Sequence, residues 1–191
     1  MVARERELNS LYIVTVIVVL VIVTATFGSL IFVFFWRSQN SYLWGHLQIP
    51  SLLWVTTAIL VASSFTLERA RAFIKIDDRS GFLRLVRITT ILGALFLFGQ
   101  GAAWWQVTHS SVVLARDKHS WFIFLFSGLH ALHILAGLAG LAYLLYRAHE
   151  PVSGPRYQMT TRAYTNALTI FWHYLGVLWI VLFLLLLTWK R

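Results

Sequence analysis

Two histidines, His130 and His133, stand three residues apart in the apolar stretch FSGLHALHILAGLAG. A third, His173, follows Trp172 in a second apolar stretch near the carboxyl end. Histidine in a membrane segment can ligate haem or a metal ion, relay protons or form hydrogen bonds between helices. The role of these three side chains therefore decides whether the chain itself takes part in a reaction or supports a reaction on another protein.

The histidines share their helix faces with small residues. At about 100° per residue, His130, His133, Gly137 and Gly140 lie on one face of a helix, and His173 and Gly176 lie on one face of another. Gln100 and Ser63 belong to similar polar faces in two further stretches. Small residues let membrane helices approach closely, and a neutral histidine has one donor and one acceptor for a neighbouring helix. The simplest interpretation is that these faces pack together inside a bundle. The second interpretation is that the histidines contact a lipid headgroup.

Haem or metal ligation is the alternative for His130, His133 and His173. Two haems in a bundle need facing histidine pairs at two depths, and the last apolar stretch has only one histidine. A metal site would also want a carboxylate, yet none of the 7 acidic residues lies in the middle of an apolar stretch. No Ser-His-Asp, phosphate-loop or HExxH pattern is present. We therefore predict no catalytic, cofactor-binding or metal-ligating residue, and keep a haem-b membrane anchor as the alternative.

The elements that must position these residues are membrane helices. The chain has 191 residues, of which 59% are hydrophobic and 12% charged, and its mean hydropathy is +0.72. Apolar runs of about 20 residues, enough to cross ~30 Å of hydrocarbon, recur along the sequence. They predict an all-α membrane protein with a single domain over 1–191 and five transmembrane helices at about 11–36, 51–70, 84–108, 120–147 and 164–189. The connections are short, so consecutive helices are expected to be antiparallel neighbours in one bundle.

The charges predict the orientation in the membrane. The net charge is +9, and eleven of the 16 basic residues fall on the side that holds the amino terminus and the second–third and fourth–fifth connections. The other side has Arg37, Arg116, Lys118, Lys190 and Arg191. Because basic residues gather on the cytoplasmic side, the amino terminus is expected in the cytoplasm. With no cysteine, the chain has no disulfide and no thiolate ligand.

Four stretches together resemble subunit III of the haem-copper respiratory oxidases. WFIFLFSGLHALHILAGLAGL resembles that family's aromatic-rich helix with two histidines three residues apart, and ALTIFWHYLGVLWIVLF resembles its last helix with a Trp-His pair. PSLLWVTTAILVASSFTLERA and LGALFLFGQGAAWW resemble two preceding helices. The matches occur in order over most of 50–187, and the sequence is identified as a divergent, five-helix member.

The resemblance implies a function for the chain. The family's subunit III carries no haem or copper, packs against catalytic subunit I, binds phospholipid and supports stability or proton uptake during oxygen reduction. His130, His133, Trp172, His173 and Gln100 occupy family-motif positions, and Ser63 does so more loosely. Haem and copper would then belong to the partner, in the cytoplasmic membrane of a bacterium or archaeon, with no nucleic acid involved. The same fold could also serve a nitric oxide reductase or a respiratory supercomplex.

Carboxylates are missing where the family pattern has them. Gly176 stands in place of an acid in the last helix, and Ala103 stands in place of a glutamate after Gln100. No acid lies between Leu11 and Trp36, where the family often has a buried glutamate. We interpret these changes as loss of a proton-related role with retention of the fold.

Overall fold

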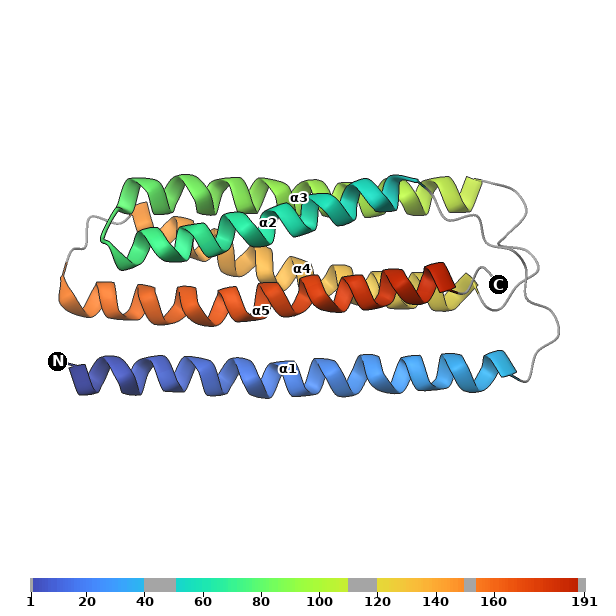
Figure 1. Ribbon diagram of the computed structural model, residues 1–191, viewed down its shortest axis with the longest axis horizontal. Helices are drawn as coiled ribbons and strands as arrows, with labels where there is room; N and C mark the ends of the chain where they lie inside the picture. Colours follow the sequence, from blue (N-terminus) through green and yellow to red (C-terminus); the bar gives the residue numbers. More distant parts are fainter. Residues whose placement is uncertain (1, 40–50, 110–119, 150–153, 189–191) are drawn as a thin grey trace.

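Five α-helices form the protein in the computed structural model, which describes residues 2–39, 51–109, 120–149 and 154–188. The helices are α1 (Val2–Gln39), α2 (Leu52–Lys75), α3 (Arg79–His109), α4 (Ser120–His149) and α5 (Pro155–Thr188) (Figure 1). Each has an apolar segment long enough to cross a membrane. The all-α, five-helix membrane fold predicted from the sequence is therefore confirmed.

Most helices extend beyond the apolar runs that predicted them. The amino-terminal turns of α1 and the last residues of α2, Arg71 to Lys75, are helical although both segments contain charged side chains. Such turns lie at the headgroup level, where charged side chains keep contact with water. Four of the five basic residues assigned to the far side, Arg116, Lys118, Lys190 and Arg191, lie outside the described residues.

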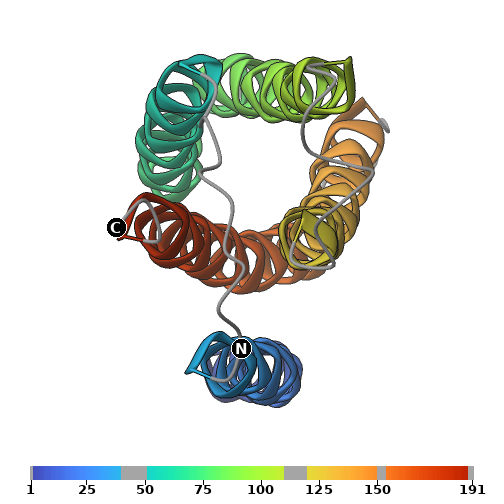
Figure 2. The same ribbon diagram turned by 90° about the vertical axis from the view of Figure 1, so that its right-hand side faces the viewer.

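Helices α2, α3, α4 and α5 surround a common axis, whereas α1 lies outside this ring against α5 (Figure 2). Along the ring each helix contacts the next, and α5 closes the ring against α2. Among the described residues α1 contacts α5 and α4 but not α2. The expectation that consecutive helices are neighbours is therefore wrong for the first pair.

The side chains on α1 explain where that helix packs. Its buried residues Val23, Phe27 and Phe34 belong to one hydrophobic cluster with Leu178 and Leu182 of α5. Thr24 forms a 2.7 Å hydrogen bond with Tyr174 of α5, and the Phe34 ring packs edge-on against Phe122 and Phe126 of α4. Helix association in lipid depends on such packing and hydrogen bonds, so matching side chains, not chain order, determine the neighbour of α1.

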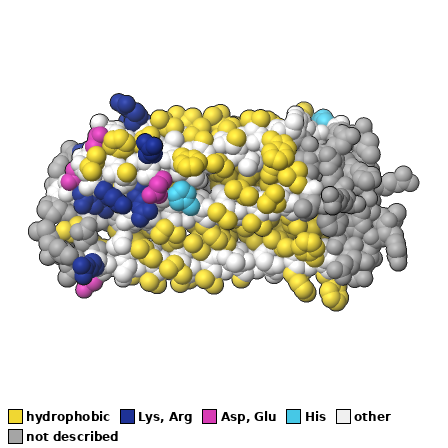
Figure 3. Space-filling model, viewed as in Figure 1, with side chains coloured by type: hydrophobic (Ala, Val, Ile, Leu, Met, Phe, Trp, Pro, Cys, Tyr) yellow, Lys and Arg dark blue, Asp and Glu magenta, His cyan; other side chains and the backbone are white. Residues whose placement is uncertain are grey.

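Apolar side chains cover most of the face seen in Figure 3, and basic side chains gather toward one end of it. Large apolar residues such as Val21, Phe32, Phe98 and Leu184 are more than half exposed. An exposed apolar surface of this extent suits a protein surrounded by lipid. The basic end includes the connection from α2 to α3 and the start of α5.

Candidate functional site

Trp172 of α5 lies at the centre of the four-helix ring. Its side chain is fully buried, and its indole Nε1–H donates a 3.0 Å hydrogen bond to the Ser63 hydroxyl of α2. Two glycines make room for the ring: a Cβ on Gly93 of α3 would lie 2.8 Å from Trp172 Cη2, and a Cβ on Gly137 of α4 would lie 2.9 Å from Trp172 Cε3. The structure therefore brings three predicted residues, Ser63, Gly137 and Trp172, into one contact.

Further polar pairs join neighbouring helices around this centre. The Gln100 amide donates to the Thr56 hydroxyl over 3.2 Å, and Trp179 Nε1–H donates to the Thr57 hydroxyl over 3.0 Å. Trp104 Nε1–H donates to the Ser127 hydroxyl, also over 3.0 Å. Each pair spans two helices and satisfies a polar group that lipid could not. Their geometry suits them to hold the bundle together.

His130 is fully buried and packs against aromatic rings. Its imidazole centroid lies 5.1 Å from that of Trp179 and 5.9 Å from that of Phe96. Neither ring nitrogen has a hydrogen-bond partner among the described residues. The hydrogen bond to another helix that the sequence suggested for histidine is thus absent at His130, where ring packing takes its place.

His133 lies one turn further along α4, on the side toward α1. Its Nδ1 is 2.7 Å from the carbonyl oxygen of Leu129 in its own helix. Its ring lies 5.8 Å, centroid to centroid, from that of Phe27 of α1. The two histidines therefore contact different helices, although the sequence places them on one face of α4.

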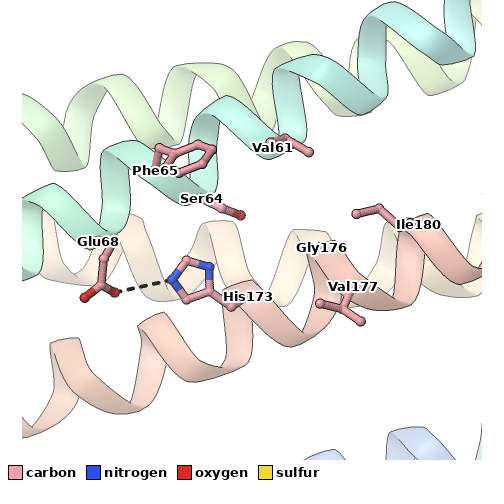
Figure 4. A pocket seen from close by; sticks show the side chains of 8 residues that line it. All are labelled: Val61, Ser64, Phe65, Glu68, His173, Gly176, Val177 and Ile180. Carbon is pink, nitrogen blue, oxygen red and sulfur yellow. Dashed lines mark hydrogen bonds and ion pairs between the residues drawn. The ribbon is translucent and has the colours of Figure 1, made fainter.

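His173 and Gly176 line a groove of about 450 Å³ between α5 and α2. Val61, Ser64 and Phe65 form its wall on α2, and Val177 and Ile180 continue it on α5 (Figure 4). At one end His173 Nε2 lies 3.4 Å from Glu68 Oε2. A Cβ on Gly176 would lie 3.4 Å from the Ser64 hydroxyl, so the absence of a side chain at Gly176 leaves space in the groove.

Glu68 is the residue at the end of this groove that the sequence analysis did not identify as a candidate. Its other oxygen, Oε1, lies 3.5 Å from Nη1 of Arg71, whose Nε donates a 2.8 Å hydrogen bond to the side-chain oxygen of Asn166. In the sequence Glu68 could be noticed only as an acid directly after the apolar run of α2. Its proximity to His173 could not be predicted, because the two residues are 105 positions apart.

Among the described residues, no group of three histidine, cysteine or carboxylate side chains could hold a metal ion. His173 has one carboxylate beside it, and His130 and His133 contact different neighbours. The described residues therefore form helix-packing contacts and line an open groove with a charged end.

Comparison with known proteins finds a matching family and several related proteins. Residues 17–191 match the family model described as cytochrome c oxidase subunit III. A cytochrome c oxidase subunit 3 from Synechocystis is 29% identical over 131 residues, which cover 69% of this chain and 54% of that protein. A probable cytochrome c oxidase subunit 3 from Nocardia farcinica is 32% identical over 129 residues, 66% of this chain and 61% of that protein.

A third relative, the cytochrome c oxidase subunit 3 of Corynebacterium diphtheriae, is 28% identical over 139 residues. These cover 73% of this chain and 65% of that protein. The matched region thus spans between about half and two thirds of the length of these relatives.

Proposed function

The chain belongs to the cytochrome c oxidase subunit III family, and from this premise we propose that it is a non-catalytic accessory subunit of a haem-copper terminal oxidase. Catalytic subunit I and the other oxidase subunits would be its partners, and haem and copper would reside there. Electron transfer and oxygen reduction would take place on the partner, with cytochrome c or quinol as donor. The observation that carries this proposal is the family match over 17–191.

The use of the polar side chains supports a structural role. Trp172, Ser63 and Gln100 form hydrogen bonds between helices, and His130 packs against aromatic rings. We propose that these residues, with His133 and Gly137, hold the helices in place. His173 and Gly176 differ because they face an open groove, and we assign to them a contact with phospholipid. Through packing and bound lipid, the subunit would stabilise the oxidase or support its proton uptake during turnover.

We further propose a single membrane domain over 1–191, in the cytoplasmic membrane of a bacterium or archaeon. The positive-inside rule supports a cytoplasmic amino terminus. Helix α1 starts at the same end of the bundle as the connection between α2 and α3 (Figure 1). Lys75 ends α2, after Arg69 and Arg71 in its last turns, and Arg79 and Arg84 lie in the first turns of α3.

Co-purification tests the accessory role. The tagged chain is extracted from native membranes in mild detergent, and the eluate is examined by mass spectrometry and by its reduced-minus-oxidised spectrum. A large multi-span chain with haem and copper in the same peak is expected. A chain that elutes alone and carries haem would instead establish the haem-b anchor, and a nitric oxide reductase subunit in the peak would reassign the complex.

The His173→Ala variant distinguishes a structural role of His173 from haem ligation. If the chain is an accessory subunit, the haem content of the complex stays unchanged and the chain dissociates from it more readily. If His173 ligates haem, the replacement abolishes the haem spectrum.

A further inference from the structure

Helix α1 is the least enclosed of the five helices. In its most apolar stretch 11% of the residues are buried, compared with 28–39% in the other four helices. One face of α1, with Val23, Phe27 and Phe34, is buried toward α5 and α4. The opposite face points away from the ring (Figure 2). A second helix can therefore lie along α1 without displacing any other part of the described chain.

The outward face of α1 carries a stripe of residues with a regular repeat. Its positions, separated alternately by four and three residues and here called the α1 stripe, are Leu11, Thr15, Val18, Ile22, Ala25, Ser29, Phe32 and Trp36. All eight are exposed, and the large apolar residues among them are 54–66% exposed. A repeat of about 3.5 residues keeps one seam toward the partner along the whole length of two paired helices. The α1 stripe has this repeat, and nothing in the described chain covers it.

Small side chains occupy the middle of the α1 stripe, and aliphatic or aromatic ones occupy its ends. Ala25 and Ser29 lie one helical turn apart near the middle of the apolar run. The ring helices instead expose larger residues near their middle, such as Val61 of α2 and Leu135 of α4. Small residues one turn apart allow two membrane helices to approach closely. Two copies of the stripe therefore fit each other, since they touch at the small centre and diverge toward the large ends.

The charges that precede the stripe match a second copy better than a different helix. The segment 4–7 reads Arg-Glu-Arg-Glu, and both Arg6 and Glu7 are exposed. Other segments at this end of the bundle are mainly basic, as Arg69, Arg71 and Lys75 of α2 illustrate. Arg6 would repel a helix that carries only basic residues at this level. In two copies of the segment, by contrast, the arginines of each can pair with the glutamates of the other.

We infer that the α1 stripe binds the α1 stripe of a second copy of this chain. Copies inserted in one membrane share one orientation, so the two helices are parallel, and Ala25 and Ser29 face their own equivalents across a two-fold axis. Because α1 lies outside the ring (Figure 2), the pair forms without contact between the two rings. The inference does not depend on the accessory role, because it uses only the surface of α1.

Disulfide formation between single cysteines tests this inference, because the chain has no cysteine of its own. Tagged variants are oxidised with copper phenanthroline in native membranes, and the dimer is measured on non-reducing gels and identified by mass spectrometry. Ile22→Cys places a thiol on the α1 stripe. It should yield on the order of tenfold more dimer than Ile17→Cys, since facing thiols react at the effective concentration of a formed pair. Ile17 is the matched control: it is also an isoleucine, is 50% exposed, and lies about 140° away around the helix.

A second substitution tests the small centre of the stripe. In the Ile22→Cys chain, Ser29→Leu should reduce the dimer to the yield of Ile17→Cys, because the leucine holds the two backbones apart. Gly28→Leu adds the same side chain about 100° away around the helix, where nothing lies within 4 Å, and should leave the yield unchanged. Equal yields from Ile22→Cys and Ile17→Cys, no effect of Ser29→Leu, or an Ile22→Cys product that contains a different chain would each overturn the inference.

The same membranes separate this inference from the proposed function. Haem and copper that co-purify with the tagged chain report whether the oxidase is assembled. Haem without the disulfide-linked dimer would refute the contact with a second copy and leave the accessory role standing. The dimer without haem would refute the accessory role and leave the contact standing.

Discussion

At the scale of single residues, the centre of the bundle depends on space as much as on hydrogen bonds. Trp172 fits only because Gly93 and Gly137 leave room for its ring. The sequence predicted that Gly137 lies on a packing face, since it shares a helix face with His130 and His133. It could not predict which ring fills the space, because Trp172 reaches it from another helix.

Gly137→Ala should therefore destabilise the protein. The added methyl group would lie 2.9 Å from Trp172 Cε3, and overpacking of this kind costs about 1–3 kcal/mol. The matched control is Gly101→Ala on α3, where nothing lies within 4 Å; there the higher helix propensity of alanine should stabilise by up to ~1 kcal/mol. Thermal unfolding in detergent distinguishes them, and equal shifts for both variants would contradict the packing at Trp172.

His130→Leu should leave stability unchanged or raise it. Neither imidazole nitrogen has a partner among the described residues, and a buried unsatisfied polar group costs about 1–3 kcal/mol. Leucine is similar in size and keeps contact with Phe96 and Trp179. The measurement is the unfolding temperature of the purified complex together with its haem content. A marked loss of stability, or of haem, would mean that His130 binds something that its ring contacts do not reveal.

At the scale of helices, the short connection between α2 and α3 is held by an acid that caps α3. Asp78 Oδ1 accepts a 2.9 Å hydrogen bond from the Gly81 N–H and another of 2.9 Å from the Ser80 hydroxyl. Asp77, one residue earlier, has a φ of 60° and pairs with Arg162 of α5 over 2.7 Å. The cap depends on the geometry of the turn, which the residue types alone do not specify.

Asp78→Ala should lower thermal stability at neutral pH, and the difference should disappear in acid. The hydrogen bond from the Gly81 N–H, aided by Ser80, holds the pKa of Asp78 below its ordinary value of 3.8. A carboxyl with a lowered folded-state pKa stabilises the fold above 3.8, and this contribution is lost as the pH falls through the lowered value. Asp78→Asn should retain much of the stability, since asparagine also caps helices. Melting curves from pH 7 to pH 3 test this.

The packing of α1 marks the limit of sequence reasoning at this scale. Apolar runs predicted five helices because length and hydropathy are local properties of the chain. The contact of α1 with α5 depends on the Thr24–Tyr174 hydrogen bond, whose residues lie 150 positions apart, and on a cluster that includes Phe27 and Leu178. Short connections favour sequential neighbours, but they do not compel them.

At the scale of the whole molecule, the family and the fold could be predicted from the sequence, whereas the groove could not. The Trp-His and double-histidine motifs specify the family, and hydropathy specifies the helices. The groove exists because Gly176 faces Ser64 across two helices and Glu68 meets His173 there. Neither contact follows from the spacing of residues within one helix.

The orientation of the whole molecule can be measured because the chain has no cysteine. Single cysteines are introduced at Gly154, before α5, and at Thr108, in the last turn of α3, positions that lie at opposite ends of the bundle. A membrane-impermeant maleimide should label Thr108→Cys in intact right-side-out vesicles, and Gly154→Cys only after permeabilisation. The reason is that the basic connections remain in the cytoplasm. The reverse pattern would place Glu68 and Arg71 in the outer leaflet and move the proposed lipid site with them.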